Sequence, residues 1–158
     1  MAGGKWTTYR QMAEDTLDAA IRGGLLESRP CVSRTVPLRG CPAPHRMYSE
    51  DPYRAEYGTD LDAIREIEQQ APELAAPLDP ALPYTAAMVV YAVRHELART
   101  IEDVLSRRTR ALLLNAQAAL RVAPQVAALM AQELERDAAW QAQQIAVFDA
   151  LVRAHYLP

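Results

Sequence analysis

Residues that build metal and disulfide centres are scarce in this chain. Its 158 residues include only two cysteines and three histidines, and 6% of them are aromatic. Cys31 and Cys41 have no set of Cys or His partners around them, so they do not form a zinc pattern. Their spacing permits a disulfide, but the first residues lack the pattern of a secretory signal, and we expect free thiols. We expect no metal site.

Long apolar runs and an excess of positive charge are also lacking. The longest apolar run, from Ala86 to Val93, is far shorter than the roughly 20 residues of a membrane-spanning helix. The formal net charge of -3 argues against a nucleic-acid partner. Apolar residues, in contrast, are plentiful. They make up half of the chain, which is enough for one compact domain with an appended arm.

These apolar residues recur at helical spacing from the N-terminus onward. The stretch 8–22 has one apolar stripe that includes Leu17 and Ile21, and this spacing predicts a helix. The glycine pair 23–24 ends it, because glycine adopts the left-handed cap conformation without steric cost. Four prolines then fall within residues 25–46, which predicts an irregular connector.

Capping patterns predict the next two helices. A short helix follows Asp51, with proline at its first position, and stops at Gly58. Thr59 caps a second helix, and Asp62 three positions later completes a capping-box pattern. The buried stripe of this helix comprises Leu61, Ile64 and Ile67. A second proline-rich connector covers residues 72–83.

Residues 84–110 form the most informative stretch of the chain, YTAAMVVYAVRHELARTIEDVLSRRTR, which we call the signature segment. It predicts two successive helices. Thr85 caps the first, and Thr100 with Asp103 forms a capping pattern that restarts the second. The apolar side of the first helix comprises Val89, Val93 and Leu97.

The remaining residues also have helical periodicity. An apolar face continues from Ile101 to Val122, and Pro124 opens a last helical stretch at its first turn, with a break near Asp137. No segment alternates with period two for long enough to predict a strand. The fold prediction is therefore all-α, with a compact multi-helix bundle preceded by the proline-rich connector and the N-terminal helix.

Candidate chemical groups inside the helical part favour structural roles. His95 and Glu96 could suggest acid–base chemistry, but adjacent helix positions point about 100° apart. We expect His95 to lie at a helix edge and Glu96 to pair with Arg99. His45 and His155 share no motif with other residues.

The arginine cluster of the signature segment allows two interpretations. Arg107, Arg108 and Arg110 could bind an anionic partner such as a phosphate, a lipid headgroup or a neighbouring subunit. Alternatively, they pair with acids nearby, for example Arg107 with Asp103 at i,i+4, or with Glu102 or Glu96. We favour the structural interpretation.

The signature segment resembles the C-terminal domain of FAD-dependent glycerol-3-phosphate dehydrogenases and oxidases. A second stretch, GGKWTTYR at residues 3–10, resembles the segment with which the flavin domain of that family closes over its cofactor. The resemblance implies three parts: residues 1–24 are a remnant of the FAD-binding domain, 25–46 a linker, and 47–158 a helical C-terminal cap domain. One departure is Met88, where the family pattern has an acidic residue.

The resemblance also implies roles for residues near the N-terminus. In the family the glycine pair brings backbone close to the flavin, and the lysine approaches the isoalloxazine and the substrate phosphate. This assigns Gly3, Gly4, Lys5, Thr7 and Thr8 to cofactor binding in a parent enzyme, and Lys5 also to substrate binding. The alternative is that these residues are a frayed terminus before a helix.

The implied parent enzyme oxidises sn-glycerol 3-phosphate to dihydroxyacetone phosphate with FAD and passes electrons to a quinone, or to oxygen in the oxidases. This chain contains no GxGxxG motif after a strand, so it has no site for the ADP half of FAD. We therefore expect the chain alone to bind no FAD and to be inactive, as a structural cap domain.

The expected partner is the missing FAD domain, and a homo-oligomer is possible. The resemblance implies a cytoplasmic location, with the parent peripheral to the inner face of the cytoplasmic membrane and membrane contact only through the missing part. The alternative is a stand-alone helical module for protein interaction or oligomerisation, because an orphan domain exposes apolar surface that invites association.

Overall fold

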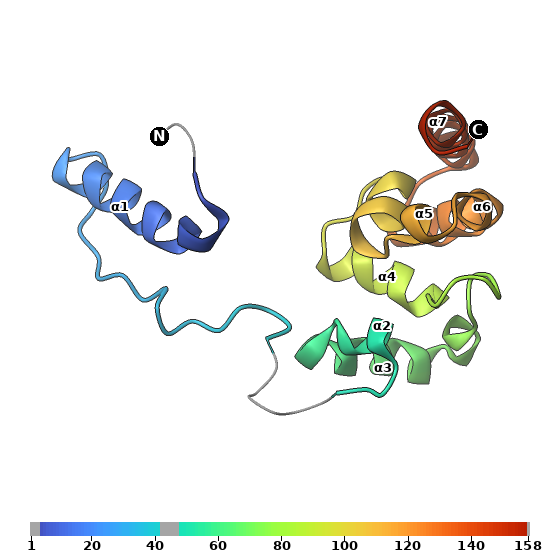
Figure 1. Cartoon of the computed structure of the whole chain (residues 1–158), viewed down its shortest axis with the longest axis horizontal. Helices are drawn as coiled ribbons and strands as arrows, with labels where there is room; N and C mark the ends of the chain where they lie inside the picture. The colour runs from blue at the N-terminus through green and yellow to red at the C-terminus, as the bar shows by residue number, and fades with distance from the viewer. Residues whose placement is uncertain (1–3, 42–47, 158) are drawn as a thin grey trace. The chain divides into compact units, whose positions relative to one another are not determined.

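A computed structural model describes residues 4–41 and 48–157 of the chain (Figure 1). The all-α prediction is confirmed: the described residues form helices and no strand, with a single isolated bridge between Pro77 and Thr85. The chain divides into two compact units, residues 1–39 and 40–158. The division falls inside the connector that the prolines predict.

The N-terminal unit contains a 3-10 turn, η1 (Trp6–Thr8), and one helix, α1 (Tyr9–Arg22). The helix ends at the predicted glycine pair, where Gly24 has a φ of +72°. Residues 25–39 then follow an irregular path, as predicted. None of the described residues of this unit is buried.

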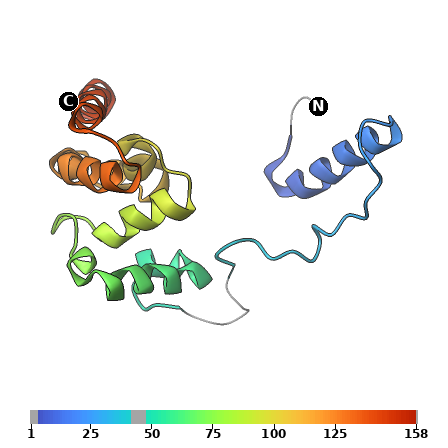
Figure 2. The same cartoon turned by 180° about the vertical axis from the view of Figure 1, so that it is seen from behind.

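The larger unit stacks its helices in successive layers. Figures 1 and 2 both show α4 between α3 on one side and α6 on the other, with α7 outermost against α6. Its elements are α2 (Pro52–Ala55), η2 (Gly58–Asp60), α3 (Leu61–Gln70), η3 (Pro72–Ala75), α4 (Ala86–His95), η4 (Asp103–Arg108), α5 (Ala111–Leu114), α6 (Ala116–Glu133) and α7 (Ala138–His155).

The predicted stripe of α3 is confirmed, but its predicted cap is wrong. Leu61 and Ile64 are fully buried and Ile67 nearly so. Thr59, however, lies inside the 3-10 turn η2, and its backbone N–H donates to the carbonyl of Gly40. The 3-10 turn η2 runs directly into α3, so the residue before the helix already has helical backbone, and no side chain caps α3. The predicted short helix after Asp51 is confirmed as α2, and the structure adds that the Asp51 carboxylate caps it by accepting from the Tyr53 N–H at 2.9 Å.

Helix α4 is the centre of the core. Every residue from Ala86 to Val93 is buried, including Met88, so a methionine at that position acts as a core filler. Thr85 occupies the predicted cap position, but its hydroxyl makes no capping bond and is buried without a partner among the described residues. The prediction for Leu97 is wrong: the helix ends before it, and its side chain is 72% exposed.

The helices that follow α4 are shorter and more often interrupted than the periodicity predicts. The restart at Thr100 is confirmed, but the following helix widens into η4, a π-helix, and then stops before α5. Pro124 does not open a helix; it lies inside α6, exposed to solvent. The predicted break near Asp137 is confirmed, and the Asp137 carboxylate accepts from the Trp140 N–H to cap α7.

Candidate functional site

The structure describes four of the five residues assigned to cofactor binding. Gly3 lies outside the described residues, whereas Gly4, Lys5, Thr7 and Thr8 are all exposed at the start of the N-terminal unit. Lys5 has extended backbone and immediately precedes η1. It is the only lysine of the chain, which otherwise uses arginine for positive charge.

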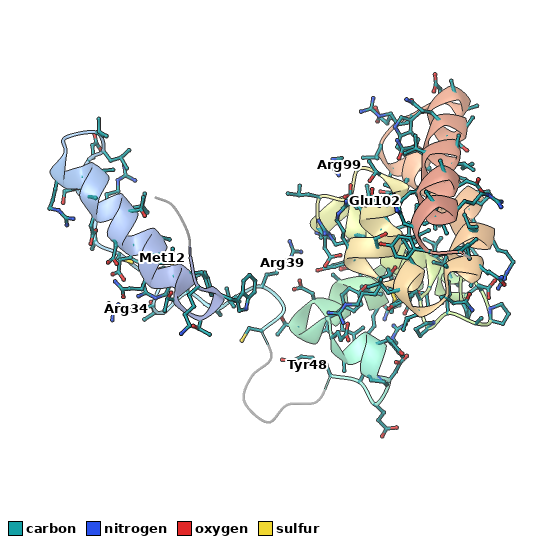
Figure 3. The ribbon with its side chains drawn as sticks, turned by 45° about the horizontal axis from the view of Figure 1, so that its top comes forward. Met12, Arg34, Arg39, Tyr48, Arg99 and Glu102 are labelled. Atoms are coloured by element: carbon teal, nitrogen blue, oxygen red, sulfur yellow. The ribbon has the colours of Figure 1, made fainter. Side chains whose placement is uncertain are left out.

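Local contacts occupy part of this segment. The Thr8 hydroxyl donates to the Lys5 carbonyl at 3.2 Å, and the Thr8 N–H donates to the same oxygen at 2.9 Å. A Cβ at Gly4 would lie 3.0 Å from the Cε atom of Met12. Met12 is labelled in Figure 3. Gly4 therefore allows close packing on α1, while Lys5 and Thr7 keep their side chains available.

An apolar groove of about 750 Å³ runs between α1 and the segment that returns beside it. Its apolar lining includes Tyr9, Leu17, Ile21, Leu26 and Val32. Two polar contacts hold the returning segment to α1: Arg10 donates to the Ser33 hydroxyl, and Arg34 pairs with Glu14 at 3.4 Å. The groove is an accessible apolar surface inside one small unit.

Most arginines of the signature segment are used inside the domain, as the structural interpretation predicts. Arg107 pairs with Asp103 at 2.8 Å, the predicted i,i+4 pair, and with Glu102 at 2.6 Å. Arg108 donates through two nitrogens to the backbone carbonyl of Glu96, not to an acid. Glu102 and Arg99, another arginine of the signature segment, are labelled in Figure 3.

Arg99 and Arg108 together satisfy carbonyls at the C-terminal end of α4. The Arg99 guanidinium donates to the carbonyls of Val93 and Ala98, and Arg108 covers that of Glu96. The last carbonyls of a helix have no partners within it, so side-chain donors there stabilise the end. Sequence reasoning placed Arg99 beside the Glu96 carboxylate; its guanidinium bonds the backbone instead.

Asp103 links the turn before η4 to the helix itself. Its carboxylate accepts from the N–H groups of Arg99 and Thr100, both at 3.0 Å, while its own N–H donates to the Thr100 hydroxyl. Burial alone would raise the pKa of Asp103, but these hydrogen bonds and the charge of Arg107 hold it below its usual range. This confirms the Thr100–Asp103 capping pattern.

A group of tyrosines packs around α4. The Tyr91 hydroxyl donates to the Asp60 carboxylate at 2.5 Å, and the His95 ring lies 4.9 Å from that of Tyr91. Burial, followed by the charge of Glu96, raises the pKa of Tyr57 far above its ordinary value. Burial likewise raises the pKa of Tyr84 to about 12. The phenols of Tyr57 and Tyr84 are therefore neutral at physiological pH.

The described residues offer little catalytic chemistry. No group of three or more His, Cys, Asp or Glu among them could hold a metal ion, and none of the helices in the described ranges is long and apolar enough to cross a membrane. Cys31 and Cys41 are exposed thiols. The candidate site remains the predicted segment around Lys5.

The sequence did not predict the left-handed backbone of two residues in the signature segment. Leu97 and Arg110 both have left-handed backbone, with φ of 58° and 57°. Such positions are usually marked by glycine or asparagine, and neither occurs here, so the sequence carries no signal for them.

Comparison with known proteins assigns the chain to a family. The family model for the C-terminal domain of alpha-glycerophosphate oxidase matches residues 46–142. A mitochondrial glycerol-3-phosphate dehydrogenase from Mesocricetus auratus is 36% identical over 152 residues, covering 85% of this chain and 21% of the relative. The mitochondrial enzyme of Homo sapiens is 37% identical over 156 residues, covering 87% and 21%.

A bacterial relative matches nearly the whole chain. The glycerol-3-phosphate dehydrogenase of Mycobacterium leprae (strain TN) is 30% identical over 172 residues, covering 99% of this chain and 29% of the relative. The chain thus spans between a fifth and a third of the length of these relatives. No solved structure is significantly similar to it. The resemblance stated from the signature segment is confirmed, and the chain belongs to the family of the C-terminal domain of alpha-glycerophosphate oxidase.

Proposed function

We propose that this chain is the C-terminal part of an FAD-dependent glycerol-3-phosphate dehydrogenase. The complete enzyme removes a hydride from C2 of sn-glycerol 3-phosphate and a proton from the C2 hydroxyl, giving dihydroxyacetone phosphate, and passes the two electrons to a quinone. The observation that carries the proposal is the family match over residues 46–142 together with relatives that are named glycerol-3-phosphate dehydrogenases. The helical unit acts as a cap over a site built mainly by a separate flavin domain.

The segment around Lys5 supplies the part of the flavin site that this chain contributes. Lys5 and Thr7 are exposed at the start of the N-terminal unit. These groups fit the edge of a flavin and a substrate phosphate: an ammonium offers a compact positive charge, and a hydroxyl donates a hydrogen bond. FAD, when bound, accepts the electrons from the substrate. Its ADP half requires a dinucleotide-binding domain that the described helices do not form.

The composition of the N-terminal unit supports a flavin domain as its partner. Eight large apolar side chains of this unit are at least half exposed, and none of its described residues is buried. A segment of this length without a core cannot offset the entropy cost of ordering its backbone. The exposed side chains are Trp6, Tyr9, Leu17, Leu25, Leu26, Val32, Val36 and Leu38. We infer that the flavin domain covers them and that residues 1–24 belong to that domain.

We place the complete enzyme at the cytoplasmic face of the cytoplasmic membrane, held there through its flavin part. The described helices offer no membrane span, and a quinone acceptor resides in the bilayer. The stand-alone interaction module is not favoured, because the family match and the relatives point to the dehydrogenase.

The proposal is tested by reconstituting the enzyme. The chain is co-expressed with the flavin domain of the glycerol-3-phosphate dehydrogenase from the same organism, and the purified complex is measured for flavin absorbance and for dye reduction with glycerol 3-phosphate. We expect both in the complex and neither in the chain alone. A chain that never associates with the flavin domain, or a complex without substrate-dependent reduction, contradicts the proposal.

Lys5 is tested separately, because it is the only lysine. Within this chain an amine-reactive reagent labels only Lys5 and the N-terminal amine, and mass spectrometry of its peptides distinguishes the two. We expect glycerol 3-phosphate to protect Lys5 in the complex, and Lys5→Met to raise KM more than tenfold. Arg22→Met, an exposed cation at the other end of α1, is the matched control. Equal labelling with and without substrate removes Lys5 from the site.

A further inference from the structure

Gly40 lies where the proline-rich connector joins the larger unit, of which it is the first residue. Residues 25–39 are all exposed, whereas Gly40 is partly buried. Its backbone is left-handed, with φ of 70°, which glycine adopts without the strain that a Cβ atom causes. Figure 3 labels Arg39, the residue directly before it. The chain therefore passes from exposed to partly buried at a position whose backbone favours glycine.

Gly40 is held against the turn that precedes α3. The Thr59 N–H donates to the Gly40 carbonyl at 3.3 Å. A Cβ atom at position 40 would lie 3.0 Å from the Tyr57 carbonyl oxygen, which is tighter than ordinary contact, so the backbone of the turn would have to move. Glycine thus allows the two stretches of backbone to approach this closely. We call Gly40, Tyr57 and Thr59 together the Gly40 contact.

The turn that contacts Gly40 is itself bonded to the core of the larger unit. The Asp60 N–H donates at 3.0 Å to the Tyr57 carbonyl, the oxygen that faces Gly40. The Asp60 carboxylate accepts from the hydroxyl of Tyr91, a buried residue of α4. Gly40 is therefore fixed to a turn that is anchored on the central helix of the core.

Other contacts hold the preceding part of the connector within the N-terminal unit. Arg34 pairs with Glu14 of α1 at 3.4 Å, and the Thr35 N–H donates to the Val32 carbonyl at 3.1 Å. Residues 36–39 follow; they are exposed, and they end at the Gly40 contact. A short exposed stretch between two fixed ends can rotate without disturbing packed residues, and hinges are usually a few loop residues of this kind.

We propose that residues 36–39 are a hinge between the N-terminal unit and the helical unit, with the contacts on α1 and the Gly40 contact as its two fixed ends. Backbone rotation within the hinge changes the relative orientation of the units while the contacts at both ends stay in place. Relative motion is the usual behaviour of units joined by a short exposed segment. The hinge is a property of this chain, so its test needs no flavin domain, and its failure leaves the proposed function unaffected.

Hydrogen exchange tests the Gly40 contact and the hinge separately. In the wild-type chain we expect the Thr59 amide to exchange about tenfold or more slowly than the hinge amides, because it donates to Gly40. Gly40→Ala should speed exchange at Thr59 by about tenfold. Gly24→Ala is the matched control and should leave Thr59 unchanged, because Gly24 has φ of 72° but nothing within 4 Å of its Cβ position. Fast exchange at Thr59 or protection of the hinge amides in the wild type overturns the proposal, and an unchanged Thr59 in Gly40→Ala removes Gly40 as a fixed end.

Spin labels on Cys31 and Cys41 measure the motion itself. The chain has no other cysteine, both thiols are exposed, and they lie on opposite sides of the hinge in the sequence. The control carries the same labels on α6, introduced by Gln117→Cys and Ala128→Cys at exposed positions of a chain without its native cysteines. We expect electron paramagnetic resonance to give a wider distribution of distances for the native pair than for the control pair. A native distribution that is no wider than the control overturns the hinge.

Discussion

Replacing Pro124 with alanine should make the helical unit markedly more stable. Pro124 lies in the middle of α6 (Ala116–Glu133), eight residues after its start. Proline has no N–H to donate to the Leu120 carbonyl one turn earlier, and its ring crowds that carbonyl. Alanine restores the hydrogen bond, and because Pro124 is exposed, its removal leaves no cavity in the core.

The expected gain follows from helix energetics. Proline in a helix interior costs about 3 kcal/mol relative to alanine, so we expect Pro124→Ala to raise the free energy of unfolding by about 2–3 kcal/mol. For a unit of this size the gain corresponds to a rise in Tm of about 5–15 °C. Thermal and urea unfolding followed by circular dichroism measure it, and hydrogen exchange reports protection of the amide introduced at position 124.

A neighbouring substitution controls for composition. Gln125 is also exposed on α6, and Gln125→Ala should change stability by less than about 0.5 kcal/mol. An unchanged or lower Tm for Pro124→Ala would refute the reasoning, because it would mean that α6 depends on the proline for its path across α4 and α7.

Three further predictions concern capping, acid stability and the independence of the units. Asn115→Ala removes the side chain that accepts from the Ala118 N–H at the start of α6, and should cost about 1 kcal/mol in urea unfolding, whereas equal midpoints would show that the cap is unimportant. Hydrogen bonding from Arg121 lowers the pKa of Asp79, so the stability from this pair is complete above about pH 4 and is lost as the pH falls through the folded pKa. Arg121→Met should therefore lower stability at pH 7 and flatten the acid limb of a pH–stability curve; an unchanged limb would exclude the pair as its origin. Deleting residues 1–39, a separate unit in which none of residues 4–39 is buried, should leave the Tm of the rest within about 2 °C in calorimetry, and a large fall would contradict the division.

Several elements follow from the sequence because local rules and burial agree there. The α3 stripe of Leu61, Ile64 and Ile67 recurs at helical spacing, and the Thr100–Asp103 pattern satisfies backbone donors within four residues. The resemblance carried by the signature segment likewise needed only residue order. For the candidate site, the resemblance predicts Lys5 and its neighbours, and the structure adds that Lys5 and Thr7 are exposed.

Other features depend on contacts between distant residues. Proline predicts a helix start at position 124, but packing of α6 against α4 and α7 keeps the helix continuous through it, since tertiary burial outweighs local propensity. Asn115 followed by Ala118 is a capping signal that could have been recognised. The π-helix η4 has no such local signal.

Residue order alone determined that this chain is helical, which family it belongs to, and where α1, α4 and α7 begin. These properties rest on periodicity and capping, which act over one or two turns. Only the tertiary structure decided that the N-terminal unit lacks a core, that Arg99 and Arg108 close the end of α4, and that Leu97 faces solvent with left-handed backbone. Burial and backbone strain arise from the way separate helices meet, and no local pattern encodes that geometry.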